Sequence, residues 1–176
     1  MRIITGQFKG RHFDIPRTFK ARPTTDFAKE NIFNVLNGYI DFDGITALDL
    51  FAGTGSISLE LVSRGCKEVV SVEKDRDHAR FIADCMKKIN AEKDILIRGD
   101  VFRFLKSCHQ KFDLVFADPP YALPELDTLP DLVFEHDLLA ADGVFVFEHG
   151  KHNDFSAHPR FKEHRSYGSV NFSIFR

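Results

Sequence analysis

The sequence predicts one α/β domain built on an open, mostly parallel sheet with helices on both faces. Two observations carry this prediction: five short apolar runs alternate with four helix-length segments, and a length of 176 residues suits a single domain with its own core. The apolar runs, which we expect to form buried parallel strands, cover residues 46–51, 68–73, 94–99, 112–118 and 143–148. The helix-length segments between them cover residues 56–64, 75–90, 101–109 and 126–140.

Both ends of the chain add elements to this plan. Residues 161–167 and 169–175 flank Gly168, and the second segment alternates apolar with polar side chains, which predicts a C-terminal antiparallel hairpin and a seven-stranded sheet. Residues 2–14 suggest a small N-terminal β-hairpin, and Thr24 or Thr25 then caps a predicted helix. The apolar face of that helix has amphipathic spacing and holds Ala28, Ile32, Val35, Leu36 and Tyr39.

A nucleotide-binding sheet that ends in an antiparallel strand pair, without a second domain, is the arrangement of class I methyltransferases, whose fold is Rossmann-like. Most dehydrogenases need a longer chain. We therefore predict a single methyltransferase domain over residues 1–176, with residues 1–40 as an N-terminal extension made of the hairpin and the helix. The ligand crevice of such a sheet lies at the carboxyl ends of its strands.

The composition is that of an ordinary globular protein, with 43% hydrophobic and 28% charged residues. No apolar run approaches the ~18 residues of a membrane span. The three cysteines are widely spaced and suggest neither a disulfide framework nor a zinc site. We expect a cytoplasmic protein that contacts no membrane and binds no metal.

Charge is distributed unevenly along the chain. The net charge is −2, yet residues 1–40 hold seven Lys and Arg against three Asp and Glu (+4), and residues 151–176 hold five against two (+3), which leaves −9 for the middle. Two basic ends around an acidic centre predict a phosphate-binding face beside an acidic cofactor site. On charge alone, random variation of a solvated surface is an equal alternative.

Residues 48–56, with the sequence LDLFAGTGS, join the first predicted strand to a helix-length segment. Gly53 and Gly55 would let the backbone approach a ligand closely, although an ordinary tight turn is the alternative. Glu73, at the end of the next strand, is placed to accept hydrogen bonds from both hydroxyls of a ribose. These residues suit NAD as well as S-adenosylmethionine, but Ser58 stands where a dinucleotide fingerprint has its third glycine, which disfavours NAD.

Asp100 follows the third predicted strand and is placed to accept a hydrogen bond from an adenine amino group, with Val101 over the ring. A helix N-cap is an equally common role for Asp100. The predicted cofactor is S-adenosylmethionine. Its predicted binding residues at the strand ends are Asp49, Phe51, Gly53, Thr54, Gly55, Glu73, Lys74, Asp100 and Val101.

The four residues after the fourth predicted strand open onto the same crevice as the glycines. An aromatic exocyclic amine is a poor nucleophile because its lone pair is conjugated with the ring, and well-placed acceptors draw the nitrogen toward tetrahedral geometry. Asp118 and the Pro119 carbonyl would be those acceptors, held rigidly by the Pro119-Pro120 pair. Tyr121 offers a face on which a flipped-out base can stack. Asp118, Pro119, Pro120 and Tyr121 are therefore the predicted catalytic residues.

The Asp118 carboxylate favours guanine modestly over adenine. Guanine presents N1–H and N2–H side by side, and a carboxylate can accept from both, whereas adenine pairs a donor with an acceptor. Adenine methyltransferases with aspartate at this position exist. Two alternatives therefore stay open: an adenine-N6 DNA methyltransferase, although no target-recognition domain is evident, and a nucleotide- or RNA-binding module without catalysis.

Over nearly its whole length the chain resembles the RsmD family of 16S rRNA guanine-N2 methyltransferases. The segments that carry the resemblance are RIITGQFKGR at residues 2–11, RPTTD at residues 22–26 with Glu30 and Phe33 after it, residues 49–55, and DPPY at residues 118–121. DPPY is shared by many amino-methyltransferases, whereas RPTTD is more specific to this family.

The resemblance implies methyl transfer from S-adenosylmethionine to a guanine N2 of 16S rRNA, of the type that acts at guanine 966, with an assembling small ribosomal subunit as partner. It implies that Arg22, Thr24 and Thr25 border the cofactor or the target base and that the basic N-terminal hairpin binds RNA. For residues 22–26, a helix cap is the simpler alternative. The predicted substrate-binding residues are Arg2, Lys9, Arg11, Arg22 and Thr24, and Thr25 is assigned to the cofactor.

Overall fold

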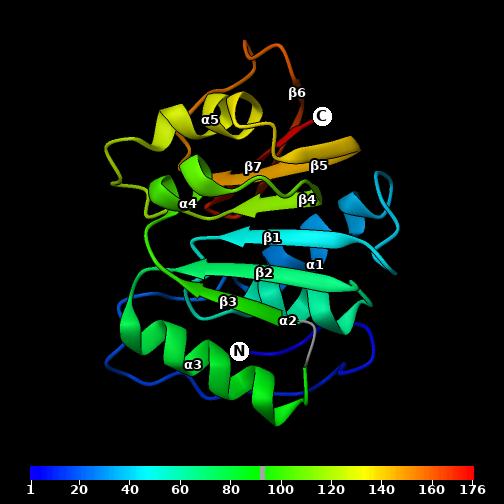
Figure 1. Cartoon of the computed structure of the whole chain (residues 1–176), viewed down its shortest axis with the longest axis vertical. Helices are drawn as coiled ribbons and strands as arrows, with labels where there is room; N and C mark the ends of the chain where they lie inside the picture. The colour runs from blue at the N-terminus through cyan, green and yellow to red at the C-terminus, as the bar shows by residue number, and fades with distance from the viewer. Residues whose placement is uncertain (92–93) are drawn as a thin grey trace.

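The computed structural model describes residues 1–91 and 94–176, which form a seven-stranded sheet with helices on both faces (Figure 1). Its strands are β1 (Thr46–Leu50), β2 (Glu68–Glu73), β3 (Asp94–Arg98), β4 (Phe112–Ala117), β5 (Leu139–His149), β6 (Phe161–Tyr167) and β7 (Val170–Phe175). Its helices are α1 (Asp26–Leu36), α2 (Ser56–Ser63), α3 (Arg76–Lys88), α4 (Val101–Ser107), the 3-10 helix η1 (Leu126–Thr128) and α5 (Leu129–Glu135). The predicted Rossmann-like sheet with a C-terminal antiparallel hairpin is confirmed.

The strand order is β3-β2-β1-β4-β5-β7-β6, with β1 to β5 parallel and β7 antiparallel between β5 and β6. The chain moves outward from β1 through β2 to β3 and then crosses back to β4. The strand order therefore reverses between β1 and β4. Ligands of open α/β sheets bind outside the carboxyl ends of the strands at this reversal.

The side chains of the strands contribute to two separate hydrophobic cores, because successive residues of a strand point to opposite faces of the sheet. On one face, α1, α2 and α3 pack against the sheet through buried residues that include Ile32, Leu61 and Ile82. On the other face, α4 and α5 cover it through Leu105 and Val133. Figure 1 shows α4 and α5 in front of the sheet and α1 and α2 behind it. The central strands are thus covered on both sides, which holds their carboxyl ends in place.

Two predictions about element boundaries are wrong. The segment predicted as one helix, residues 126–140, contains η1 and α5 and gives its last residues to β5, which begins at Leu139. Asp137 has a φ of 53°, a left-handed conformation that cannot continue a helix. Tyr39, predicted on the apolar face of the first helix, lies beyond the end of α1, where its hydroxyl donates to Glu163 Oε1 at 2.6 Å.

The predicted N-terminal β-hairpin is short: beside the antiparallel bridge between Arg2 and His12, the Ile3 N–H donates to the Arg11 carbonyl at 3.0 Å and the Phe13 N–H to the Met1 carbonyl at 2.8 Å. This hairpin packs on the carboxyl end of α2. A Cβ at Gly6 would lie 2.0 Å from the carbonyl oxygen of Ser63, and Gly6 has a φ of 93°, so this contact requires glycine.

A buried carboxylate, Glu60 of α2, fastens the N-terminal segment to the domain. It accepts hydrogen bonds from the backbone N–H groups of Ile4 and Thr5 at 2.8 and 3.0 Å. Its charge is balanced by Arg64 Nε at 3.1 Å and Lys29 Nζ at 3.7 Å. Because a buried charge is costly without partners, these contacts give residues 1–14 a defined position on α2.

Candidate active site at the carboxyl ends of β1 and β4

A cavity of about 960 Å³ opens at the carboxyl ends of β1, β2 and β4, beside the reversal of strand order. This volume is in the range of cofactor and substrate sites. The sequence-predicted residues in its wall are Arg22, Thr24, Thr25, Asp49, Phe51, Gly53, Thr54, Glu73, Lys74, Asp100, Val101, Asp118, Pro119, Pro120 and Tyr121. The structure thus brings together the loop after β1, the turn after β4 and the segment before α1.

The loop after β1 is shaped by left-handed backbone conformations. Gly53 and Gly55 have φ values of 58° and 80°, and Phe51 has a φ of 59°, which is uncommon for a residue with a side chain. A Cβ at Gly55 would lie 2.9 Å from Cγ1 of Ile82, so α3 can pack this closely only against glycine. Gly55 therefore shapes the loop as the N-cap of α2, while Phe51 and Gly53 line the cavity.

Glu73 ends β2 with a side chain that is nearly buried. Its Oε2 accepts a hydrogen bond from the Gly53 N–H at 2.6 Å, and its Oε1 accepts one from the Asp75 N–H at 3.0 Å. A carboxylate offers about four acceptor positions, so these two bonds leave capacity for ribose hydroxyls. Backbone donors thus hold Glu73 at the cavity wall without help from a ligand.

Two predicted cofactor residues are also helix caps. Asp100 is the N-cap of α4, and its Oδ1 accepts from the Arg103 N–H at 3.0 Å. Thr25 is the N-cap of α1, and its Oγ1 accepts from the Ala28 N–H at 3.2 Å. Both side chains also line the cavity. The helix-cap alternative is therefore confirmed for both residues, and their contact with a cofactor stays a prediction.

Asp49 lies at one end of a buried chain of polar side chains that runs across three strands. Ser58 Oγ lies 2.6 Å from Asp49 Oδ2 and 2.7 Å from Ser71 Oγ, which lies 2.8 Å from Asp94 Oδ1. Three hydrogen bonds need three protons, and the two hydroxyls supply two, so the third is a carboxyl proton. Burial raises the pKa of Asp49 to about 7 and that of Asp94 to about 6, in agreement with this count.

Glu148, at the end of β5, is a site residue for which the sequence indicates no role. Its Oε1 accepts a hydrogen bond from Tyr121 Oη at 2.8 Å, and its Oε2 accepts one from Thr24 Oγ1 at 3.1 Å. It lines the same cavity as Asp118. The only signal in the sequence is its place at the end of a strand that opens onto the crevice, because both hydroxyl partners are distant along the chain.

Asp118 and Glu148 are neighbouring acids in the wall of this end of the cavity. Burial, then the nearby charge of Glu148, raises the pKa of Asp118 well above its ordinary value. Burial also raises the pKa of Glu148, but the donors Tyr121, Thr24 and Asp118 oppose that rise. The negative charge of the pair is therefore better accommodated on Glu148 than on Asp118.

Three of the residues predicted to contact RNA, Arg2, Lys9 and Arg11, are not among those that line the cavity. Arg2 Nε pairs with Asp26 at 3.1 Å, and Arg11 donates to the carbonyl of Lys88, at the carboxyl end of α3, at 3.1 Å. Lys9 is exposed on the same N-terminal segment. Helices that connect parallel strands run antiparallel to them, so the carboxyl ends of α2 and α3 lie at the edge of the sheet opposite the cavity. Contact of Arg2, Lys9 and Arg11 with RNA stays a prediction.

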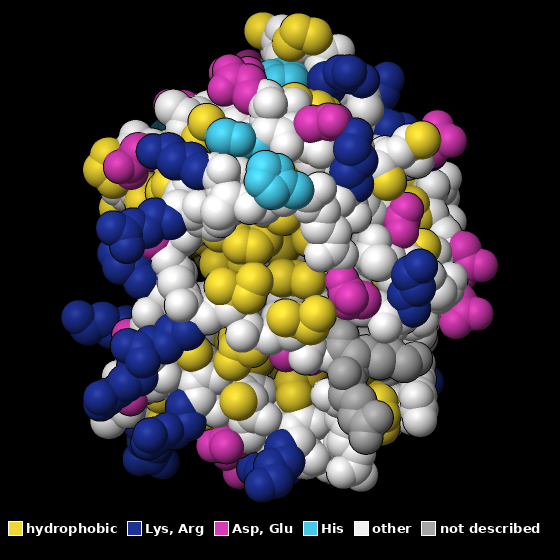
Figure 2. All heavy atoms as spheres, viewed as in Figure 1, with side chains coloured by type: hydrophobic (Ala, Val, Ile, Leu, Met, Phe, Trp, Pro, Cys, Tyr) yellow, Lys and Arg dark blue, Asp and Glu magenta, His cyan; other side chains and the backbone are white. Residues whose placement is uncertain are grey.

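Basic side chains also surround the cavity itself. Exposed Lys20, Arg22 and Lys74 line it, and the Arg22 guanidinium donates to the carbonyls of Phe19 and Ala21. Figure 2 shows Lys and Arg side chains gathered on the left, the edge toward which the β1 and β2 arrows point in Figure 1. The basic surface that the charge distribution predicted therefore includes the rim of the site.

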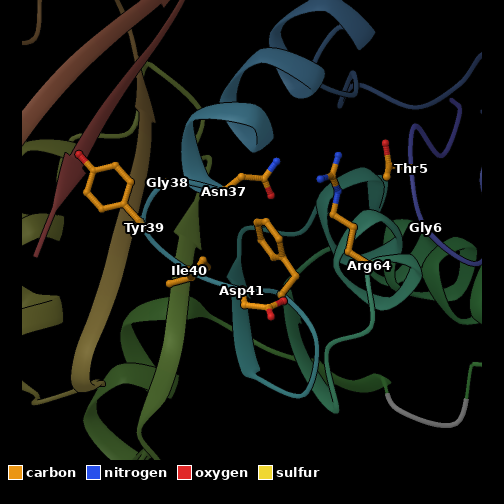
Figure 3. Close-up of a pocket in the computed structure, with 9 residues that line it drawn as sticks. Thr5, Gly6, Asn37, Gly38, Tyr39, Ile40, Asp41 and Arg64 are labelled. Atoms are coloured by element: carbon orange, nitrogen blue, oxygen red, sulfur yellow. The ribbon is translucent and has the colours of Figure 1, made fainter.

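A second hollow, of about 550 Å³, lies beside the loop after α1 (Figure 3). The Arg64 guanidinium at this hollow pairs with Glu60 and lies over the rings of Phe33 and Phe42 at 4.5 and 5.5 Å. Tyr39 points away from Arg64 toward the C-terminal strands in Figure 3. The Arg64 guanidinium is therefore already occupied by contacts that stabilise the fold.

Within residues 1–91 and 94–176, no group of three or more His, Cys, Asp and Glu side chains is arranged to hold a metal ion. Over the same residues, the helices are too short or too polar to cross a membrane.

A family model described as Conserved hypothetical protein 95 matches residues 1–176. Two relatives are named Ribosomal RNA small subunit methyltransferase D. The Haemophilus influenzae protein is 32% identical over 152 residues, which cover 84% of this chain and 78% of the relative. The Escherichia coli protein is 30% identical over 148 residues, which cover 84% of this chain and 74% of the relative.

Solved structures give the same picture of the fold. Protein TTHA0928 of Thermus thermophilus is 27% identical and superposes with a TM-score of 0.88 over 100% of this chain and 99% of its own. SMU.776, a structure described as a complex with SAH, is 15% identical with a TM-score of 0.67, and the match covers 84% of this chain and 49% of that chain. At that identity the likeness to SMU.776 shows only the fold. The family match over residues 1–176, together with these relatives at 30% and 32% identity, establishes that this chain belongs to the Conserved hypothetical protein 95 family, the RsmD family of rRNA methyltransferases.

Proposed function

We propose that this protein transfers a methyl group from S-adenosylmethionine to the exocyclic N2 of a guanine in 16S rRNA. The observation that carries the proposal is that Asp118 and Tyr121 line the same cavity as Gly53 and Glu73. An acceptor for an aromatic amine and a ribose-binding carboxylate thus face one space. The names of the relatives, which specify methylation of small-subunit ribosomal RNA, support the same reaction class.

The cavity suits the cofactor at its β1–β2 side. Glu73 is held with acceptor capacity for the ribose hydroxyls, and Asp100 and Val101, which also line the cavity, are the residues proposed to contact the adenine. The left-handed turn at Gly53 brings backbone close to the remainder of the cofactor. When bound, S-adenosylmethionine supplies a methyl group on a positively charged sulfur, so the protein needs no strong base.

The target base belongs at the β4–β5 side. Asp118 and the Pro119 carbonyl are the acceptors for the exocyclic amine, and the ring of Tyr121, whose side chain is 47% exposed, is available for stacking. Correct alignment of the reacting atoms can lower the barrier by about 7–11 kcal/mol. A guanine suits this end because its N1–H and N2–H both need acceptors.

RNA reaches the site across the basic rim that contains Lys20, Arg22 and Lys74. Phosphate contacts of this kind position a polyanion without reading its sequence. We therefore expect that recognition of one guanine depends on the shape of an assembling small ribosomal subunit in addition to the chain's own contacts.

The test is a methylation assay with isotopically labelled S-adenosylmethionine on three substrates: naked 16S rRNA, small-subunit particles that lack the modification, and DNA duplexes. Digestion to nucleosides and mass spectrometry should show labelled N2-methylguanosine from ribosomal RNA. N6-methyladenosine as the sole product, or transfer confined to DNA, would overturn the guanine proposal.

A matched control separates catalysis from binding. Asp118→Ala should abolish transfer while calorimetry with S-adenosylhomocysteine still shows cofactor binding, because Glu73 and the loop after β1 are unchanged. Undiminished transfer by this variant would show that Asp118 is not the amine acceptor. Binding without transfer by the wild-type protein would favour a non-catalytic binding module.

A further inference from the structure

Glu148 joins three separate segments of the site through its two carboxylate oxygens. Tyr121 of the turn after β4 donates to one oxygen at 2.8 Å, and Thr24 of the segment before α1 donates to the other at 3.1 Å. The side chain is almost completely buried, with 5% exposure. A carboxylate this deep is costly unless it is well paired, which makes its presence at the cavity wall informative.

We propose that Glu148 is a positioning residue of the target-base site, which orients Asp118 and Tyr121 and carries the negative charge of the Asp118–Glu148 pair beside the reacting nitrogen. This inference rests on the proposed function. Glu148 belongs to β5, whereas the DPPY turn follows β4 and the glycine loop follows β1. The proposed positioning role therefore adds a third strand to the site.

The negative charge on Glu148 matters because methyl transfer moves positive charge from the sulfur of the cofactor to the nitrogen of the base. The nitrogen lone pair forms the new C–N bond as the C–S bond breaks toward sulfur, so sulfur becomes neutral and nitrogen becomes cationic until it releases one proton to water. A fixed negative charge near the nitrogen stabilises that change, as preorganised charges do in other active sites. Glu148 suits this task better than Asp118, because only Glu148 receives two hydroxyl donors.

The groups that face the pair limit the alternatives. Asp118 and Tyr121 approach from the turn after β4, Thr24 from the segment before α1, and Asp49 from β1. The other charged residues in the cavity wall are Lys20, Arg22, Glu73, Lys74, Asp75, His78 and Asp100. Among the described residues, none of them forms a salt bridge with Glu148. No neighbouring cation therefore neutralises the negative charge of the pair.

The decisive variant is Glu148→Gln, which keeps the size of the side chain and can still bond to both hydroxyls but removes the charge. We expect kcat to fall about 10- to 100-fold at pH 7, while the Kd for S-adenosylhomocysteine stays within about twofold of wild type. The rise of kcat with pH should also move to higher pH, since the charge must then reside on Asp118, which has no hydroxyl donor. The deficit should therefore shrink as the pH is raised.

The matched control is His149→Gln, which changes the next residue of β5. His149 is buried and lies 2.7 Å from Ser173 Oγ through Nε2, outside the cavity wall. This variant should leave the pH profile of kcat unchanged even if the protein loses stability. A general loss of folding in β5 would instead affect both variants alike.

Thr24→Ala provides a second measurement if Glu148→Gln is poorly folded. Removal of one donor raises the pKa of Glu148 and should shift the pH profile in the same direction by a smaller amount. A wild-type rate and pH profile in Glu148→Gln, or a rate that falls equally at all pH values, overturns the role of Glu148. The absence of guanine methylation by the wild-type protein contradicts the proposed function instead, and the two failures are therefore distinguishable.

Discussion

The two ends of the cavity hold their carboxylates by different means. At the cofactor end, Glu73 accepts hydrogen bonds from the backbone N–H groups of Gly53 and Asp75. At the target end, Glu148 accepts from the side-chain hydroxyls of Tyr121 and Thr24. Backbone donors have positions set by the loop and the strand, whereas hydroxyls rotate and depend on distant segments. The cofactor end is therefore held rigidly by the backbone, whereas the target end is an adjustable network of side-chain hydroxyls around Glu148.

The donors at the two ends also differ in what they control: those to Glu73 set geometry, and those to Glu148 set the location of a charge. The donors to Glu73 fix where a ribose can bind and change little with pH. The donors to Glu148 determine which of two acids carries the charge, so the target end should respond to pH and to the loss of a single hydroxyl. Variants at the two ends should accordingly affect different kinetic constants.

The largest expected effect is at the target end. Asp118→Ala removes the acceptor oxygen for the exocyclic amine, and kcat should fall at least about 10²- to 10³-fold. The Kd for S-adenosylhomocysteine, measured by calorimetry, should change less than about threefold. A parallel loss of cofactor affinity would show that the two ends are not independent.

At the cofactor end, Glu73→Ala removes the acceptor for the ribose and for the Gly53 N–H. Hydrogen bonds to a charged group contribute about 1.5–3 kcal/mol, so the Kd for S-adenosylhomocysteine should rise about 10- to 100-fold. The kcat at saturating cofactor should stay close to wild type. Glu73→Gln, which keeps one acceptor oxygen, is the matched control and should have a smaller effect.

The chain from Asp49 to Asp94 predicts a pH effect on stability. The pKa of Asp49 is about 7 in the folded protein and 3.8 ordinarily, so the folded state keeps this proton over a range where the unfolded chain has lost it. Its contribution is present below about pH 4 and is lost as the pH rises to about 7, by roughly 4 kcal/mol. Urea unfolding of ligand-free protein at pH 5 and pH 8 should show a smaller difference in Asp49→Asn than in wild type. An identical pH dependence in both proteins would contradict the shared proton.

The smallest expected effect concerns the segment that joins the two ends. Thr25→Ala removes the N-cap of α1 and should lower the free energy of unfolding by about 1 kcal/mol. Thermal and urea unfolding measure this change. If Thr25 also contacts the cofactor, the Kd for S-adenosylhomocysteine rises as well. Thr25→Ser, which keeps the capping oxygen, should restore both properties.

Local patterns were enough to predict much of the fold and one half of the site. The alternation of strands and helices, the terminal hairpin, the glycine loop and the DPPY turn all consist of residues near one another in sequence. Strand alternation places Gly53, Glu73 and Asp118 at carboxyl ends of parallel strands, and the sheet then gathers those ends at one edge. Because the strands are parallel, residues that follow different strands in the sequence lie close together in space.

The remaining features depended on contacts between segments that no local pattern specifies. The N-terminal hairpin packs on α2 through Glu60, which accepts from the Ile4 N–H at a separation of 56 residues. The helix predicted over residues 126–140 ends early because Asp137 adopts a left-handed conformation and Leu139 pairs with Phe112 of β4, which propensity does not reveal. Its prediction failed because tertiary packing outweighs local preference.

By itself, the sequence determined the order of the elements, the carboxyl-edge location of the crevice and the identity of its Asp118-Pro119-Pro120-Tyr121 turn, because each depends on backbone chemistry within a few residues. Only the tertiary structure decided that Glu148 would accept from Tyr121 and from Thr24, which is 124 residues away. The physical reason is that a hydroxyl and a carboxylate pair according to distance in space, and that distance is established only when β5 packs beside β4 and the segment before α1 closes over both.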